Sequence, residues 1–305
     1  MCGFGLTEGK TMINGQNTTK KINGGVAFVL AFAIFNFVGI ICSLIVSAVG
    51  LEKSTLYYVI SGLVSSVSFL IVILYFSYAN RVNPLRISNV NKCSWIYFLL
   101  AIIIAIGMFF GFGFANGLLI GWLESLGLNF PKDEPRVATL TQLIVYGVIF
   151  AILPAILEES FFRGVMLNGI KGKPIFVTLS ISICFALYHG SLAQFIYQFV
   201  FGFMLTLLAV KAKSALPSIV AHFTNNLGIL ILDYLKIEVN LLDLRMIISG
   251  MVLIISVAVL LLCKSSVKTD QQDSRLGGEN IKNFWLPFGL LGVLFCAFVV
   301  IVSLF

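Results

Sequence analysis

Residues 140–170 read LTQLIVYGVIFAILPAILEESFFRGVMLNGI, an apolar run interrupted by two adjacent carboxylates and one guanidinium. Ionisable residues at bilayer depth are costly and by default mark a functional site. Residues four apart share one face of an α-helix, so Glu159 is predicted to form an ion pair with Arg163. Glu158 is rotated by ~100° from Glu159 and has no cation at that spacing. We therefore expect Glu159 and Arg163 to support the site and Glu158 to carry its chemistry.

The same run contains Pro154, one helical turn before Glu158. Proline has no amide hydrogen, so it is predicted to delete the helical hydrogen bond to the Phe150 carbonyl and to kink the helix there. A kink at this depth could open a water-filled cavity beside Glu158.

The composition is that of a polytopic membrane protein. The chain has 305 residues, of which 59% are hydrophobic and 11% charged, whereas a soluble domain carries about 25% charged residues. The net charge of +7 is attributed to basic loops on the inner side of a membrane, so no nucleic-acid partner is expected. Six cysteines show no paired spacing and are interpreted as small buried hydrophobes rather than disulfides or metal ligands. They are Cys2, Cys42, Cys93, Cys184, Cys263 and Cys296.

Apolar runs divide the chain into candidate spanning helices, each of which needs ~20 residues. The runs are 26–49, 57–79, 95–123, 139–169, 174–189, 191–210, 215–235, 246–263 and 284–305. The predicted fold is all-α, a polytopic transmembrane helical bundle of about nine spans, with eight also possible. The fifth and sixth runs are short and are expected to form a tight hairpin around His189-Gly190-Ser191. The first run is too long for the apolar region of a cleavable signal peptide.

The loops predict an orientation with the N-terminus inside. Alternate segments each carry at least two basic residues, while the other loops offset theirs with acids. The inside residues are Lys10, Lys20, Lys21, Arg81, Arg86, Lys92, Lys171, Lys173, Lys211, Lys213, Lys264, Lys268, Arg275 and Lys282. We predict a flexible cytoplasmic tail over 1–24, N-terminal transmembrane helices over 25–138, a catalytic core over 139–235 and C-terminal transmembrane helices over 236–305. Asp233, near the outer end of the seventh run, is interpreted as a snorkelling interfacial residue.

Both histidines of the chain lie in apolar runs. His189 is near the end of the fifth run, and His222 is in the seventh, four residues before Asn226 and on the same helical face. Counting ~1.5 Å per residue from the cytoplasmic ends places Glu158 and these three residues within the ~30 Å core of a bilayer. Three helices can therefore converge at one depth. Asn225 is rotated off that face, and its replacement is expected to have little effect.

Such a cluster suits hydrolysis. A glutamate beside a histidine can take a proton from water, while a second histidine and an asparagine amide can donate to the oxyanion that forms at a peptide carbonyl. A lone intramembrane histidine or asparagine is more often an interhelical hydrogen bond. Two histidines together with an unpaired glutamate favour catalysis.

The motifs Glu158-Glu159-x-x-x-Arg163, Phe185-x-x-x-His189 and His222-x-x-x-Asn226 occur in this order on successive segments. They resemble the CPBP (Abi-like) family, which comprises CAAX proteases and bacteriocin-processing proteins and includes the type II CAAX prenyl endopeptidase. The resemblance covers about residues 139–235 and implies an intramembrane endopeptidase with an all-helical core. It implies that Glu158 and His189 activate water, that His222 and Asn226 form the oxyanion hole, and that Glu159 and Arg163 orient the first group.

The cofactor prediction leaves two possibilities. The chain has no His-Glu-x-x-His motif and no cysteine in the cluster, so catalysis without a metal is preferred. Zinc is the alternative, and its ligands would be Glu158, His189 and His222, which would leave only the paired Glu159 as a base.

The sequence also leaves the function class open. The expected partners are the lipid bilayer and a membrane-associated peptide or protein substrate, either of CAAX type or a bacteriocin or leader-peptide precursor. One alternative is a non-enzymatic bacteriocin-immunity or scaffold protein, and another is a proton-coupled transporter. The abundance of Ile, Asn and Lys hints at a bacterial plasma membrane.

Overall fold

The structure, a computed structural model, describes residues 22–51, 54–128, 130, 135–237, 244–263, 278–286 and 290–295. These residues are mostly helical, as predicted. The α-helices are α1 Gly24–Val49, α2 Thr55–Asn80, α3 Pro84–Ile87, α4 Ile96–Gly107, α5 Gly113–Ser125, α6 Leu140–Tyr146, α7 Leu153–Glu159, α8 Pro174–Tyr188, α9 Leu192–Ala212, α10 Leu216–Tyr234, α11 Leu244–Leu262 and α12 Ile281–Phe284. Three π-helical segments are η1 Met108–Phe112, η2 Gly147–Ile152 and η3 Ser160–Met166, and two short strands are β1 Ile170–Lys171 and β2 Glu279–Asn280.

Five helical segments are long and apolar enough to cross a membrane. They are Gly24–Val49, Thr55–Asn80, Ile96–Ser125, Leu140–Met166 and Leu192–Ala212, and Pro174–Tyr188 and Ile247–Leu262 are shorter apolar helices. Each of the first eight predicted runs is helical, while the count of nine spans and the orientation stay predictions. Residues 1–21 of the predicted tail and most of the run 284–305 lie outside the described residues.

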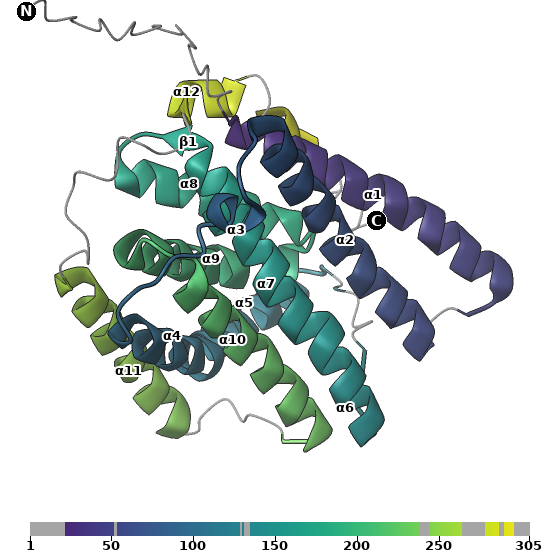
Figure 1. Ribbon diagram of the computed structural model, residues 1–305. Coiled ribbons are helices and arrows are strands. Elements are labelled where there is room, and N and C mark those ends of the chain that lie inside the picture. Colours follow the sequence, from purple (N-terminus) through teal and green to yellow (C-terminus); the bar gives the residue numbers. More distant parts are fainter. Residues whose placement is uncertain are drawn as a thin grey trace, which may run out of the picture.

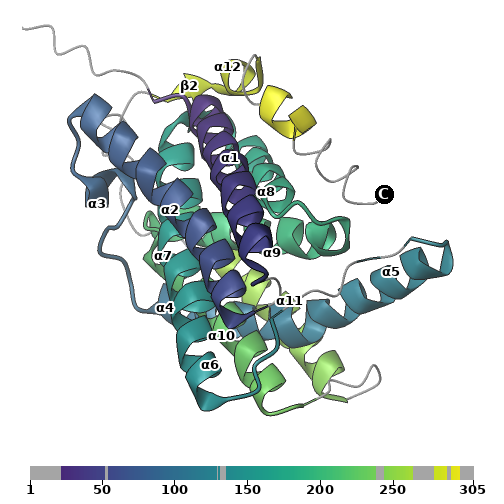
Figure 2. The same cartoon turned by 90° about the vertical axis from the view of Figure 1, so that its right-hand side faces the viewer.

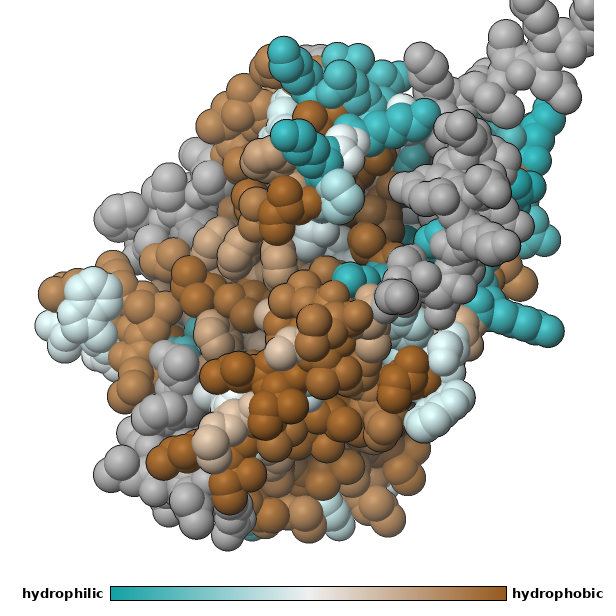
Figure 3. All heavy atoms as spheres, turned by 90° about the vertical axis from the view of Figure 1, so that its left-hand side faces the viewer, coloured by the Kyte–Doolittle hydropathy of each residue, from teal (hydrophilic) through white to brown (hydrophobic). Residues whose placement is uncertain are grey.

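The surface of the bundle is apolar over a wide area. Figure 3 shows hydrophobic residues covering much of one face, with hydrophilic residues gathered above and beside them. Large side chains such as Phe37 in α1 and Ile254 in α11 are 68% and 71% exposed. Exposed apolar area on this scale is stable against lipid and not against water, which supports an integral membrane protein.

The helix with the acidic motif runs from Leu140 to Met166 without a break, through α6, η2, α7 and η3. Pro154 lies in the first turn of α7, directly after the π-helical segment η2. A proline removes one helical hydrogen bond, and a π-helical turn lets the chain continue past the gap. In Figure 1 this helix runs alongside α2, and it also packs against α10.

The predicted hairpin between the fifth and sixth runs is present. α8 ends at Tyr188 and α9 begins at Leu192, and the two helices pack against each other. Gly190 in the turn has a φ of +62°, a left-handed conformation that glycine adopts without steric cost. Figure 2 shows this hairpin behind α1, while α5 projects away from the bundle.

One backbone oxygen joins three distant parts of the chain. The carbonyl of Gly169, just after η3, accepts hydrogen bonds from the amide of Gly24 at 3.1 Å and from the amide of Glu279 at 3.2 Å. The same neighbourhood holds the parallel pairing of β1 with β2, which the apolar pattern does not predict. The start of α1 and the segment before α12 are therefore both anchored at the end of the motif helix.

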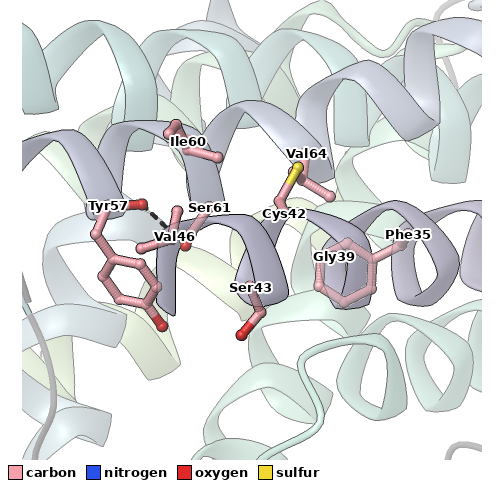
Figure 4. Close-up of a pocket in the computed structure, with 9 residues that line it drawn as sticks. All are labelled: Phe35, Gly39, Cys42, Ser43, Val46, Tyr57, Ile60, Ser61 and Val64. Carbon is pink, nitrogen blue, oxygen red and sulfur yellow. Dashed lines mark hydrogen bonds between the residues drawn. The ribbon is translucent and has the colours of Figure 1, made fainter. Parts of the chain in front are cut away.

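A small cavity of about 150 Å³ lies between α1 and α2 (Figure 4). Its lining is mostly apolar, and the hydroxyl of Ser61 within it donates to the Tyr57 carbonyl at 3.0 Å. Two further cavities, of about 180 and 530 Å³, are lined by other described residues. None of the six predicted site residues lines any of these three cavities.

Candidate active site

The predicted ion pair forms in the interior of the bundle. Arg163 Nη1 donates to Glu159 Oε1 at 2.8 Å, and both side chains are fully buried. The acid lies at the end of α7 and the base in η3, four residues later on the same helical face. A buried charge needs a partner of opposite charge, and Glu159 and Arg163 are partners for each other.

Arg163 is also held by a neighbouring helix. Its Nη2 donates to the carbonyl of Gly202 in α9 at 2.8 Å, and its guanidinium carbon lies 4.6 Å from the ring centre of Phe185. A Cβ at position 202 would come within 2.9 Å of that ring. Glycine therefore allows the α9 backbone to approach the arginine and the aromatic ring at once.

His222 shares the same acid. Its Nδ1 lies 2.8 Å from Glu159 Oε1, so α10 is hydrogen-bonded directly to α7. A carboxylate accepts, so Nδ1 is assigned the hydrogen, and this contact does not use Nε2. The buried ring lies between Phe185 and Phe201, with ring centres 6.0 and 5.8 Å away. Sequence spacing could not indicate which of the two acids His222 would contact.

Glu158 differs from Glu159 in its hydrogen bonding. It is 7% exposed, and no hydrogen bond to its carboxylate is found among the described residues, whereas Glu159 accepts two on Oε1. The Oε2 atoms of both acids have no hydrogen-bond partner in the described part of the chain. Glu158 interacts electrostatically with His222, Glu159 and Arg163, which places it beside the paired cluster. Glu159 is therefore fixed by Arg163 and His222, whereas Glu158 is not fixed by a hydrogen bond to either of them.

His189 lies at the end of α8, and its Nδ1 is 2.8 Å from the Phe185 carbonyl. A carbonyl can only accept, so Nδ1 carries the hydrogen and Nε2 of the neutral ring has a free lone pair. The ring is partly buried and lies 4.8 Å from that of Phe185. In the described part of the chain no hydrogen bond joins His189 to Glu158, although it interacts electrostatically with His222 and Arg163.

Asn226 and Asn225 are both connected to the motif helix. Asn226 Nδ2 donates to the Phe150 carbonyl in η2 at 2.9 Å. Asn225 Nδ2 donates to Asn226 Oδ1 at 3.2 Å, and its own Oδ1 accepts from the Tyr197 hydroxyl at 2.6 Å. Asn225 is rotated off the face of Asn226, as predicted from helical geometry, but its side chain contacts that of Asn226; that its replacement has little effect stays a prediction. Neighbouring residues point about 100° apart on a helix, yet the two amides still reach each other.

Asp233 has a protein partner. Its exposed carboxylate accepts from the Val137 amide at 2.5 Å and so ties the end of α10 to the segment before α6. It also lines the cavity of about 530 Å³. This contact is compatible with a position at the membrane interface, and it adds a structural role that the sequence did not indicate.

The described residues contain no group of three or more His, Cys, Asp or Glu side chains arranged to hold a metal ion. The three ligands of the zinc alternative, Glu158, His189 and His222, do not form such a group. Nδ1 of each histidine is already engaged, with a backbone carbonyl in one case and with Glu159 in the other. Metal coordination would require the two Nε2 atoms.

Fold and site together define a helical membrane protein whose interior holds a cluster of two acids, an arginine and two histidines. Residues 140–228 match the family model described as Type II CAAX prenyl endopeptidase Rce1-like. The match spans the chain from α6 into α10 and contains all six predicted site residues. It confirms the resemblance to the CPBP and CAAX protease family for this segment, which is under a third of the chain. No curated protein and no solved structure matches the chain.

Sequence reasoning missed three participants: Tyr197, Gly202 and the backbone carbonyl of Phe150. A backbone acceptor has no side-chain signature, so Gly202 could not have been found. The Phe150 carbonyl did have a signal, because Pro154 removes its helical donor and a carbonyl within the bundle needs another.

Proposed function

We propose that the protein is an intramembrane endopeptidase that hydrolyses a peptide bond in a membrane-associated protein or peptide precursor. The substrate is a CAAX-type protein or a bacteriocin or leader-peptide precursor, and the membrane is a bacterial plasma membrane. The observation that carries this proposal is the contrast between the two adjacent acids: Glu159 accepts hydrogen bonds from Arg163 and His222 on Oε1, whereas no hydrogen bond to the Glu158 carboxylate is found among the described residues. The family match supports the protease class.

The two acids have different roles. Glu159 accepts two hydrogen bonds on Oε1 and orients Arg163 and His222. Glu158 takes a proton from water while the water oxygen attacks the peptide carbonyl carbon. The proton then passes to the amine as the carbon–nitrogen bond breaks, so that one water yields one new carboxyl group and one new amine. His189 Nε2, which has a lone pair when the ring is neutral, shares this proton.

A single proton shift prepares both halves of the site. With Glu159 and Arg163 ionised, the cluster is neutral when Glu158 is protonated and His222 is not. It is also neutral when Glu158 is ionised and His222 carries the proton. In this second form Glu158 can accept a proton from water. His222, whose Nδ1 already donates to Glu159, then has an Nε2–H to donate to an oxyanion.

Asn226 supplies a second donor for the oxyanion. Its side-chain nitrogen carries two hydrogens, and one is used on the Phe150 carbonyl. The other is free for a substrate oxygen that becomes negatively charged. No metal is required in this scheme. If zinc is bound, Glu158, His189 and His222 would hold it, and zinc would polarise the carbonyl or the water.

The test is cleavage by purified protein in liposomes of a farnesylated peptide ending in a CAAX sequence, with a bacteriocin leader-peptide precursor as second substrate. We expect Glu158→Gln to lower the rate by about 10²- to 10⁴-fold, the size of a lost general base, with an unchanged melting temperature. Glu279→Gln, the same change on β2, is the matched control and should cleave at the wild-type rate. A Glu158→Gln protein that cleaves normally would refute the proposal. Failure of the wild type to cleave either substrate would favour the non-enzymatic scaffold.

A further inference from the structure

Three side chains form a hydrogen-bonded relay that ends on the helix that carries the proposed base. Tyr197 in α9 donates to Asn225 Oδ1 at 2.6 Å, Asn225 Nδ2 donates to Asn226 Oδ1 at 3.2 Å, and Asn226 Nδ2 donates to the Phe150 carbonyl at 2.9 Å. The relay crosses from α9 through α10 to η2, on the motif helix that holds Glu158. Asn225 is 4% exposed, so water competes little for its amide.

The direction of the relay is set at its last acceptor. A backbone carbonyl can only accept, so the Asn226 atom that faces Phe150 has to be nitrogen. Its oxygen then faces Asn225, which has to present its own nitrogen, and the Asn225 oxygen in turn faces a hydroxyl that donates. Reversing either amide would place two acceptors or two donors against each other. Every polar atom along the relay therefore has one allowed orientation.

The last acceptor is available because of Pro154. In an α-helix the Phe150 carbonyl would receive the amide of residue 154, and proline has none. A partly buried carbonyl that has lost its helical donor gains from a new one on a neighbouring helix. Asn226 is that donor. Pro154, which lies four residues before Glu158 on the same helix, thereby determines which way the Asn226 amide points.

We infer that Tyr197 and Asn225 are positioning residues of the proposed active site, holding the Asn226 amide so that its second N–H is available to the oxyanion. This inference rests on the proposed function. The alternative is that the relay only fastens α9 and α10 to the motif helix. The two possibilities differ in their kinetic consequences, because a donor needed only in the transition state affects kcat and leaves KM unchanged.

Tyr197→Phe removes one hydroxyl and keeps the ring. We expect kcat to fall about 2- to 10-fold, the equivalent of one neutral hydrogen bond, with KM unchanged. The melting temperature should fall slightly, because Asn225 Oδ1 loses its donor. Tyr146→Phe, at another buried tyrosine, is the matched control and should have wild-type kcat. Asn226→Ala should lose about 10²- to 10³-fold. In the Asn226→Ala background Tyr197→Phe should cost nothing further, because the amide it positions is gone.

Pro154→Ala provides a second, independent measurement. It returns an amide to the Phe150 carbonyl, so the melting temperature should rise or stay equal while kcat falls, because Asn226 is released from its fixed orientation. If the relay only fastened the helices, the melting temperature and kcat of Pro154→Ala should change in the same direction. Wild-type kcat in Tyr197→Phe, or a full Tyr197→Phe effect in the Asn226→Ala background, would overturn the inference. If the inference about Tyr197 and Asn225 is overturned while Glu158→Gln is inactive in the same assay, the proposed function stands. If Glu158→Gln is active, the proposed function itself fails.

Discussion

Replacing Arg163 by alanine removes the cation at the centre of the cluster. The guanidinium is fully buried and donates at 2.8 Å both to Glu159 Oε1 and to the Gly202 carbonyl. In Arg163→Ala the Glu159 carboxylate keeps only its contact to His222. The Gly202 carbonyl keeps a donor, because the Thr206 hydroxyl also bonds it at 2.8 Å. Most of the cost therefore comes from the stranded acid and not from the backbone oxygen.

The size of this effect follows from removing one partner of a buried pair. We expect Arg163→Ala to lower the free energy of unfolding by about 3–5 kcal/mol. The double variant Glu159→Gln with Arg163→Met leaves no charge without a partner and should recover much of that loss. Glu159→Gln alone should also be destabilising, because Arg163 then remains as an unpaired buried cation. The double variant should therefore be more stable than either single variant.

The assay is equilibrium unfolding of the purified protein in mixed detergent micelles, followed by circular dichroism. Arg86→Ala is the matched control, since Arg86 is exposed and such changes cost within about 0.5 kcal/mol. If Arg163→Ala unfolded with the stability of Arg86→Ala, the guanidinium would be reaching the membrane surface and the pairing argument would be refuted. If the double variant were less stable than both single variants, an unpaired charge would not be the cause of their instability, although the burial of Arg163 would still stand.

Two further predictions concern topology and metal. Reporter fusions after Lys173 and Lys213 should give cytoplasmic signals and one after Arg136 an external signal, because the basic loops alternate; an external signal from either of the first two would disprove the orientation. Peptide cleavage should survive strong chelation followed by dialysis, because Glu158 is proposed to act as the base without a metal, and a rate lost on chelation and restored by zinc would make the zinc alternative correct.

The sequence predicted the features that depend on one helix. The pair between Glu159 and Arg163 follows from a spacing of four residues, and the helical runs follow from apolar segments long enough to span a membrane. The turn at Gly190 follows from two short runs separated by almost nothing. Each of these needs no knowledge of how one helix is rotated against another.

Contacts between helices could not be predicted in the same way. His222 contacts Glu159 and not the adjacent Glu158 because of how α10 and α7 are rotated against each other, which the sequence does not give. The inclusion of Asn225 depends on Tyr197, which lies in a helix that carries none of the three motifs. Asn225 lies on a different face of α10 from Asn226, yet its amide reaches both the Asn226 amide and the Tyr197 hydroxyl of the next helix.

The double hydrogen bond at the Gly169 carbonyl has a consequence for how the chain is made. During synthesis the amide of Gly24 is available as soon as Gly169 emerges, whereas the amide of Glu279 exists only after all helices through α11 have been translated. Since chains fold from the N-terminus as they are synthesised, the end of the motif helix is first fastened to α1 and later closed by β2. A nascent chain stopped before residue 279 would therefore contain every residue of the acidic cluster and still lack the final contact of the helix that carries Glu158.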